Sequence, residues 1–270
     1  MRQYKIFVLA IQVILLPQAL FSGFERTAQP ATVLGRALSG SASLQFENVW
    51  INPAAVTAAT SVQSLLFYSP SPFQLPQLSS YGCIGGFTLY NYSFAMGFQT
   101  FGFSLYRESA VSMSIGTSVA EDMHAGVTFH LYQLSISRYG SSVTEVLDVG
   151  SVYSLSEVVN VGVAMNNVTG SKFGGDDDIP RSLISGISLN IEDRATVNFD
   201  LIKDLRYPVS HRAGIELLLH EIVAVRAGVQ GGVPRLFGGF SISIIPFRID
   251  YSIATHNDLG LSHSIGIAIE

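Results

Sequence analysis

The chain has 270 residues and a formal net charge of −5, and only 13% of its residues are charged although 48% are hydrophobic. About a quarter of the residues of ordinary soluble domains are charged, so this composition argues against a soluble domain and requires a large core or lipid to cover the apolar surface. The few lysines and arginines are not clustered along the chain, which argues against nucleic acid as a partner.

The N-terminus has the features of a secretory signal peptide. Arg2 and Lys5 precede an apolar stretch at 6–16, and a basic start followed by a short apolar run is typical of such peptides. The alternative for this run is a short buried helix, and after it no run approaches the roughly 18–20 consecutive apolar residues that a membrane-spanning helix needs. We therefore expect residues 1–23 to form a signal peptide. Small residues that suit its cleavage site are Ala19, Ser22 and Gly23.

Residues 24–61 form a segment of a different kind. They are rich in glycine, serine and alanine, lack strand-like alternation, and include a helical-looking stretch at 53–59. Asn52 suits the N-cap of this helix, and Pro53 suits its first turn. We expect the segment to be an N-terminal plug inside or beneath a barrel, with the motif Asn52, Pro53 and Ala54 anchoring it to the wall.

From residue 62 onward the sequence consists of segments of roughly ten residues in which apolar and polar residues alternate, the period of β-strands. Because lipid tolerates no open sheet edge, strands that cross a membrane must close on themselves. The expected fold class is all-β, a transmembrane antiparallel β-barrel over 62–270 with about fourteen strands. The predicted strands are 62–69, 79–90, 93–105, 109–118, 122–137, 145–154, 158–167, 181–191, 195–203, 210–220, 222–231, 236–245, 247–255 and 261–269.

The connections between the predicted strands fall into two classes. Those after even-numbered strands are very short, whereas those after odd-numbered strands are mostly longer, as at 70–78 and 168–180. Outer-membrane barrels have short periplasmic turns and longer outer loops. The pattern therefore predicts a bacterial outer-membrane protein with both termini periplasmic, and outer-membrane lipid and lipopolysaccharide as its surroundings.

Charged residues occupy the polar phase of several predicted strands. A charge on the lipid face near the middle of the bilayer costs about 2–4 kcal/mol, so these side chains should face the lumen. We expect them to form an ion-pair network whose role is to fill the barrel rather than to select ions. They are Asp148, Asp200, Arg212, Glu216, Arg226, Arg248 and Asp250.

The third predicted strand changes phase. Its apolar residues include Phe94 and Phe98 and then switch to the other parity at Phe101, which an extra residue at Gln99 and Thr100 would explain as a β-bulge. We weigh an ordinary bulge against a lateral gate, and continuous strand pairing on both sides of Gln99 would exclude the gate.

The sequence offers no convincing catalytic or metal constellation. The pairs at 210–211 and 263–264 combine serine with histidine, but adjacent residues of a strand point to opposite faces and cannot cooperate directly. His124 and His130 lie far apart along one strand, and no cysteine joins them. We therefore expect no enzymatic activity, no metal site and no cofactor.

Two N-terminal stretches carry a family resemblance. Leu-Gly-Arg-Ala at 34–37 and Asn-Val-Trp-Ile-Asn-Pro-Ala-Ala at 48–55 resemble the N-terminal signature of the FadL and PorV/PorQ group of outer-membrane proteins, in which an Asn-Pro-Ala motif lies in the plug. Later stretches are similar to the closing strands of the PorV/PorQ-like branch. They lie at 213–216, 225–229, 249–251 and 259–265.

The resemblance implies a fourteen-stranded barrel with an N-terminal plug. For the PorV/PorQ branch it implies a part in type IX protein secretion or surface attachment of cargo, with secretion-system subunits or cargo as partners. For the FadL branch it implies passive uptake of a hydrophobic ligand, such as a fatty acid or hydrocarbon, through a side opening at a kinked third strand. Because the inward positions are rich in polar residues, we expect the PorV/PorQ-type function. FadL-like transport is the alternative and a structural scaffold the second alternative.

Overall fold

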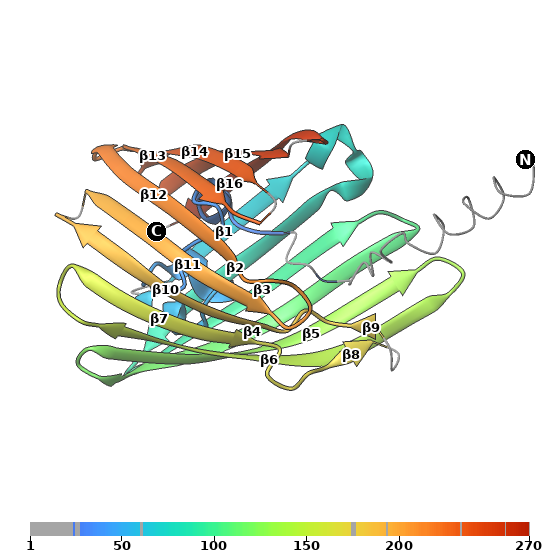
Figure 1. Ribbon diagram of the computed structural model, residues 1–270, viewed down its shortest axis with the longest axis horizontal. Helices are drawn as coiled ribbons and strands as arrows, with labels where there is room; N and C mark the ends of the chain where they lie inside the picture. The colour runs from blue at the N-terminus through green and yellow to red at the C-terminus, as the bar shows by residue number, and fades with distance from the viewer. Residues whose placement is uncertain are drawn as a thin grey trace, which may run out of the picture.

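Fourteen strands close into a single antiparallel barrel in the computed structural model (Figure 1). The structure describes residues 24, 28–59, 62–173, 177–192, 194–232, 234–256 and 258–269, and the predicted signal peptide at 1–23 lies outside them. The first strand of the barrel pairs with both the second and the last, which closes the sheet. The predicted all-β transmembrane-type barrel is confirmed.

Around the barrel the strands follow their order in the chain. They are β1 (Gln63–Ser69), β2 (Ser80–Leu89), β3 (Tyr92–Gly102), β4 (Tyr106–Ala120), β5 (Met123–Ile136), β6 (Gly140–Ser154), β7 (Val159–Asn166), β10 (Ser182–Ile191), β11 (Ala195–Asp204), β12 (Ser210–His220), β13 (Val223–Gln230), β14 (Arg235–Ile244), β15 (Phe247–His256) and β16 (Gly260–Ile269). The short strands β8 (Lys172–Phe173) and β9 (Asp177–Asp178) pair with each other in the loop between β7 and β10.

The connections divide between the two ends of the barrel as the sequence predicts. The end that we call the short-turn end carries the turns 90–91, 121–122, 155–158, 192–194, 221–222 and 245–246. The opposite end, the long-loop end, carries the connections 70–79, 103–105, 137–139, 167–181, 205–209, 231–234 and 257–259. The first of these contains two short 3-10 helices, η3 (Pro72–Gln74) and η4 (Pro76–Leu78).

Two strands on one side of the barrel, β4 and β6, are longer than the sequence predicts. β4 begins at Tyr106 rather than at 109, and β6 at Gly140 rather than at 145. The polar residues after Gly140 suggest a loop, but the chain turns tightly at 137–139, where Arg138 and Gly140 have φ of 70° and 100°, and continues directly into the ladder with β5. β5 and β6 therefore project at the long-loop end (Figure 1), beyond the first β6–β7 pair, Val149 with Met165.

The strands present alternating faces to lipid and lumen. In β11, Phe199 and Leu201 are each 44% exposed on the outside, whereas Asn198, Asp200 and Ile202 between and beside them are buried. This alternation is the pattern of a barrel whose outer face is apolar. Among the residues that the structure describes, no helix is long and apolar enough to cross a membrane.

The predicted bulge in β3 is wrong. Throughout this strand, which the structure describes completely, the register with β2 and β4 is unbroken, and Gln99 and Thr100 each have a partner on both sides. The continuous pairing also excludes a lateral gate at this position. The apolar phase switches because Phe101 faces the lumen, as do its register partners Ser80 and Glu108, which are both buried.

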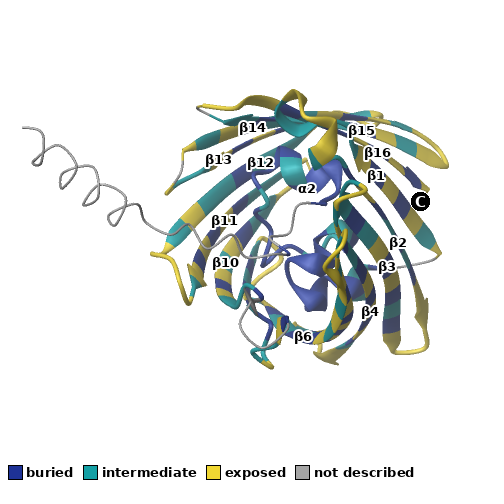
Figure 2. Cartoon of the chain, turned by 90° about the vertical axis from the view of Figure 1, so that its right-hand side faces the viewer, coloured by how far each residue is buried: buried dark blue, intermediate teal, exposed yellow. Residues whose placement is uncertain are grey.

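Residues 28–59, which we call the luminal segment, lie inside the barrel (Figure 2). They contain the helix α2 (Ala31–Gly35) and the 3-10 helices η1 (Phe46–Trp50) and η2 (Pro53–Ala58). Near its end, Thr57 hydrogen-bonds His124 of β5 close to the short-turn end. Phe24 lies at the other end of the barrel, the long-loop end, where its N–H donates to Glu108 near the start of β4. The chain therefore passes through the barrel from the long-loop end to the short-turn end.

The ends of the described chain consequently lie at opposite ends of the barrel. The first strand begins and the last strand ends at the short-turn end, as an even strand number requires, but Phe24 lies at the long-loop end. The expectation that both termini lie on one side thus holds for the barrel strands and not for the start of the described chain. Which compartment each end faces stays a prediction.

Candidate functional site

The luminal segment touches the wall at inward-facing glycines. A Cβ at Gly126 would lie 2.3 Å from the carbonyl oxygen of Pro53, and one at Gly162 would lie 2.1 Å from that of Ser41. No side chain fits at such distances, so the two backbones approach closely only because these residues are glycine. A Cβ would also come within 3.0 Å of the segment at Gly86, Gly97, Gly116, Gly150, Gly186, Gly214 and Gly228. We call these nine residues the glycine ring.

Asn52 joins the luminal segment to this wall. Its Oδ1 accepts a hydrogen bond from the Ala54 N–H at 3.0 Å, which confirms the predicted helix cap followed by Pro53. Its Nδ2 donates to the carbonyl oxygen of Ser41 within the segment at 2.5 Å and to that of Ser151 in β6 at 3.1 Å. One side chain therefore fixes both the local turn and its position against the barrel.

Four of the seven predicted lumen charges lie in one cluster. Arg226 forms an ion pair with Glu216, and Arg248 Nε lies 3.0 Å from Asp250 Oδ1. The Ser241 hydroxyl hydrogen-bonds both Arg226 and Asp250 and so links the two pairs. The structure therefore brings four of the seven predicted residues together on β12 to β15.

The luminal segment completes this cluster with residues that could not be predicted from strand alternation. Glu47 Oε1 lies 2.6 Å from Arg248 Nη2, and Gln45 Nε2 donates to Glu216 Oε1 at 3.0 Å. Arg36, which is fully buried, donates to Gln45. We call these residues together with Glu216, Arg226, Ser241, Arg248 and Asp250 the charge cluster; it attaches the segment to four strands.

Two further predicted charges hold the segment at another place. Asp200 of β11 accepts from the Gly40 N–H at 2.9 Å and from the Ser41 hydroxyl at 2.7 Å. Arg212 lies opposite Asp200 in the β11–β12 register and donates to the Leu38 carbonyl oxygen at 3.3 Å. These contacts hold residues 38–41 of the luminal segment against β11 and β12.

Asp148 stands apart from the other predicted charges. Its Oδ2 lies 3.2 Å from His130 Nε2, and His130 Nδ1 lies 2.9 Å from Ser112 Oγ. Serine, histidine and aspartate in this order match a nucleophile, a base and an orienting acid. However, Ser112 is only 1% exposed, and of the three only Asp148 lines the cavity described below. The chain of bonds therefore orders the wall of β4 to β6 and presents no accessible nucleophile.

Glu47 is strongly stabilised as a carboxylate. Burial by itself would raise its pKa, but attraction to Arg248 and Arg36 outweighs burial and lowers the pKa of Glu47 to about 2. A carboxyl group whose pKa is lower in the folded than in the unfolded state adds stability above its unfolded pKa, here 4.5, and loses it as the pH falls through the folded value. The charge cluster should therefore withstand mild acid.

Trp50, the only tryptophan of the chain, lies buried in the luminal segment. Its fluorescence therefore reports whether the charge cluster still holds the segment at low pH. We expect its fluorescence emission to stay constant from pH 7 to pH 4 and to shift only as the pH approaches 2, because Glu47 then becomes protonated. A Glu47→Gln variant should lack this acid-dependent step. A shift of the wild-type emission between pH 5 and pH 4 that is absent from the variant would contradict the assignment.

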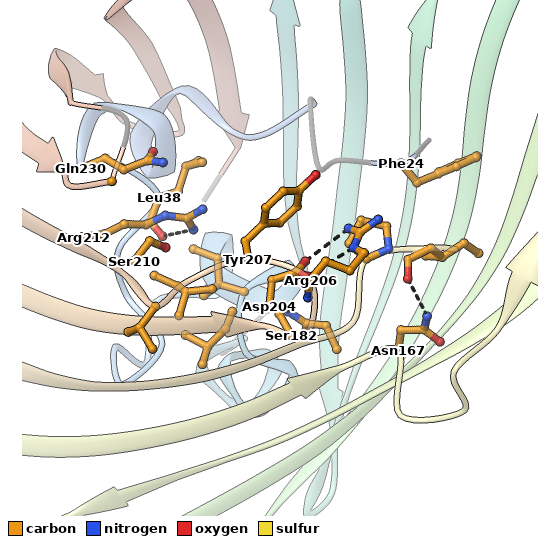
Figure 3. Close-up of a pocket in the computed structure, with 18 of the residues that line it drawn as sticks. Phe24, Leu38, Asn167, Ser182, Asp204, Arg206, Tyr207, Ser210, Arg212 and Gln230 are labelled. Carbon is orange, nitrogen blue, oxygen red and sulfur yellow. Dashed lines mark hydrogen bonds and ion pairs between the residues drawn. The ribbon is translucent and has the colours of Figure 1, made fainter. Parts of the chain in front are cut away.

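A cavity of about 570 Å³ lies at the long-loop end, between the luminal segment and the wall (Figure 3). Leu38 and Ile51 of the segment contribute to its lining, and Val146, Ile184 and Ile202 of β6, β10 and β11 form apolar parts of its wall. The buried side chains of Ile51, Ile184 and Ile202 also pack against one another in one hydrophobic cluster.

The lining of the cavity becomes polar at the loop after β11. Arg206 pairs there with Asp204 at 3.3 Å, and its guanidinium lies 5.3 Å from the centre of the Tyr207 ring. Arg212 and Asn167 add further polar groups, as Figure 3 shows. The cavity can therefore accept an apolar molecule between its aliphatic walls and offers hydrogen-bonding groups near the loops.

Comparisons with known proteins agree with this geometry at the level of the fold. No family model and no curated protein matches the sequence. Among solved structures, the toluene transporter TodX of Pseudomonas putida is similar, with a TM-score of 0.64 and 12% identity over 90% of this chain and 97% of that chain. A Pseudomonas aeruginosa FadL homologue has a TM-score of 0.57 and 11% identity over 89% and 96% of the two chains. The chain has the fold of a FadL-like outer-membrane barrel.

A third structure widens the comparison. The outer membrane protein Omp33 of Acinetobacter baumannii has a TM-score of 0.54 and 8% identity, over 78% of this chain and 97% of that chain. TodX and its mutants are described as a transporter and as a monoaromatic hydrocarbon channel, not as enzymes. These comparisons support the FadL-like alternative and give no support to the PorV/PorQ-like branch or to type IX secretion, which the sequence analysis ranked first.

Proposed function

We propose that the protein is a passive transporter of small hydrophobic molecules in the bacterial outer membrane, and that the long-loop end faces outward. The observation that carries the proposal is the cavity at that end, which has apolar walls and a floor made by the luminal segment. Its volume of about 570 Å³ falls within the range of typical small-molecule sites. The similarity to TodX supports the same class of substrate.

The luminal segment acts in this proposal as the plug that the sequence predicted for 24–61. It fills the lumen at the glycine ring and is held by Asn52, by Asp200 and by the charge cluster. A molecule that enters the cavity meets Leu38 and Ile51 of the segment. Passage towards the short-turn end therefore requires a local displacement of the segment, which would make transport selective and slow for ions.

A bulky side chain inside the cavity tests this proposal. Ser182 lines the cavity, whereas its neighbour Leu183 on the same strand is 49% exposed on the outer face. We expect Ser182→Phe to reduce uptake of the uncharged fluorescent probe N-phenyl-1-naphthylamine by intact cells to the rate of cells without the protein, because the ring occupies the cavity. Leu183→Phe, at equal abundance in the outer membrane, should leave uptake unchanged. Equal uptake by the two variants would contradict a route through the cavity.

A further inference from the structure

We propose that the outer face of β4 to β6 at the long-loop end binds the phosphorylated headgroup of a glycolipid of the outer leaflet through Arg107 and Arg138. This inference goes beyond transport and rests on one part of the proposed function, the outward orientation of the long-loop end. Three observations carry it. The apolar outer face ends before these strands do, the wall beyond it is polar and basic, and the two arginines lie at one corner of that wall.

The apolar outer face of these strands has a clear border. Val111 of β4 and Leu131 of β5 are register partners on the outside and are 42% and 41% exposed. The next outward-facing pair towards the long-loop end is Ser109 with Gln133, which is polar. In a membrane barrel the apolar band of the outer face marks the extent of the hydrocarbon. On this side of the barrel the hydrocarbon therefore ends between these two pairs.

The wall continues well beyond this border. β5 runs on from Leu131 to its last residue, Ile136, which at about 3.4 Å per residue is about 17 Å along the strand. At a strand tilt of about 45° this is about 12 Å in height, whereas the headgroup layer of a phospholipid bilayer is only about 5–8 Å deep on each side. The projecting wall therefore suits a larger headgroup, such as a phosphorylated disaccharide.

Two exposed arginines lie at one corner of the projecting wall. Arg107 of β4 faces outward, since its neighbour Glu108 is buried on the lumen face. Arg138 lies in the tight turn after β5. The N–H of Ser137 in this turn donates to the carbonyl oxygen of Leu105 at 2.9 Å, which holds the turn against the chain that enters β4. The two arginines are thereby placed within reach of one headgroup.

The charge on this outer face is positive beyond the border. On the outer face of β4, β5 and β6, which the structure describes along their whole length, the one acid is Glu145, and it lies at the border itself. Beyond it the charged residues are Arg107 and Arg138. Guanidinium groups bind phosphate through paired, charge-assisted hydrogen bonds. The hydroxyl groups of Ser135 and Ser141, register partners on the same face, can hydrogen-bond a sugar.

A lipid fits this surface better than a dissolved anion. On the membrane side of the border, Val111, Met113, Phe129 and Leu131 expose apolar side chains on the outer face. The acyl chains of a lipid lie along these side chains while its phosphates meet the arginines, so that one molecule gains both contacts. Its anchoring in the leaflet also keeps the phosphates at a high local concentration. A dissolved phosphate gains only exposed ion pairs, which contribute little in water.

Titration of the purified protein in detergent with diphosphoryl lipid A, followed by native mass spectrometry, tests the proposal. We expect the double variant Arg107→Gln, Arg138→Gln to bind about 30-fold more weakly than the wild type, because each arginine at an anionic lipid surface contributes about 1 kcal/mol and about 1.4 kcal/mol is a factor of ten. Arg194→Gln, which changes an exposed arginine at the short-turn end, should bind like the wild type. Equal affinities of the wild type and the double variant would overturn the proposal.

Two further probes of the wild type identify the source of the anion. We expect lipid A without its phosphates to bind about 30-fold more weakly than diphosphoryl lipid A, the same factor as for the loss of both arginines. Inorganic phosphate at millimolar concentration should leave diphosphoryl lipid A bound. Displacement by inorganic phosphate, or equal binding of the two lipids, would contradict a site for a phosphorylated lipid.

The orientation on which the proposal rests is measured separately. Tyr139 is 90% exposed beside Arg138, so Tyr139→Cys in a Cys83→Ser background should react with a membrane-impermeant maleimide in intact cells. Label that appears only after the cells are broken would contradict this inference and the outward orientation together. Label in intact cells and normal uptake of N-phenyl-1-naphthylamine, combined with equal lipid A binding by the wild type and the double variant, would contradict this inference alone.

Discussion

Replacing Arg248 by methionine is expected to lower the free energy of unfolding by about 3–5 kcal/mol, the usual cost of removing one partner from a buried ion pair. Arg248 contacts both Glu47 of the luminal segment and Asp250 of its own strand. Its loss would leave two carboxylates close together in the lumen without their shared cation. The contact between the segment and β15 should weaken most, so that Trp50 becomes accessible to solvent at lower denaturant concentrations.

Denaturant titration followed by Trp50 emission measures this effect in detergent-solubilised protein. Arg194→Met is the matched control, because Arg194 is exposed at the short-turn end and surface charges contribute about 0–1 kcal/mol. If Arg248→Met unfolds at the same denaturant concentration as Arg194→Met, the charge cluster does not hold the segment.

Replacing Gly126 by alanine is expected to displace the luminal segment, although only one methyl group is added. The new Cβ would lie 2.3 Å from the Pro53 carbonyl oxygen, and neither backbone can yield without breaking the Asn52 contacts beside it. Overpacking of this kind costs about 1–3 kcal/mol, and the displaced segment should let ions pass. We expect a rise in the steady conductance of planar bilayers that contain the variant.

Gly238→Ala on β14 provides the control for this experiment. A Cβ there would meet Ile253 at 3.7 Å, an ordinary van der Waals contact, so neither stability nor conductance should change. Equal conductance of the two alanine variants would show that the glycine ring is not where the segment closes the lumen.

The barrel could be predicted from the sequence because its two strongest signals are local. Alternation along each strand separates lipid-facing residues such as Phe199 and Leu201 from buried Asp200, and the parity of loop lengths requires an even number of strands. The limits of β6 were wrong because serines and Gly140 suit a loop as well as a strand end. The bulge at Gln99 was wrong because an aromatic residue, Phe101, faces the lumen.

Only the part of the candidate site that lies on the strands could be predicted from the sequence. Charges on the strands, such as Glu216 and Arg248, stood out against an apolar alternation, but their partners Gln45 and Glu47 lie in a segment without periodicity. Glycines at inward positions of many strands were a usable signal for close contact with a plug. The cavity left no local signal, because its lining comes from the luminal segment and from loops far apart in the sequence.

The order of the functional alternatives changed for a physical reason. Polar inward residues argued against a hydrophobic conduit, but many of them bind the luminal segment rather than line a route, as Asp200 and Arg212 do. The apolar inward residues Ile184 and Ile202 lie towards the long-loop end and line the cavity. The lumen therefore has a polar part that binds the luminal segment and a more apolar part at the long-loop end. The average polarity of all inward-facing residues does not reveal this difference.

The central claim is that the barrel is plugged and yet passes small hydrophobic molecules. Uptake of two solutes by the same cells tests this claim most directly. We expect cells that make the protein to take up N-phenyl-1-naphthylamine faster than cells that lack it, while the hydrophilic β-lactam nitrocefin, hydrolysed by a periplasmic β-lactamase, enters both at the same rate. That result would establish a plugged barrel that passes a hydrophobic molecule. Faster entry of both solutes would contradict the plug, and unchanged entry of both would contradict transport.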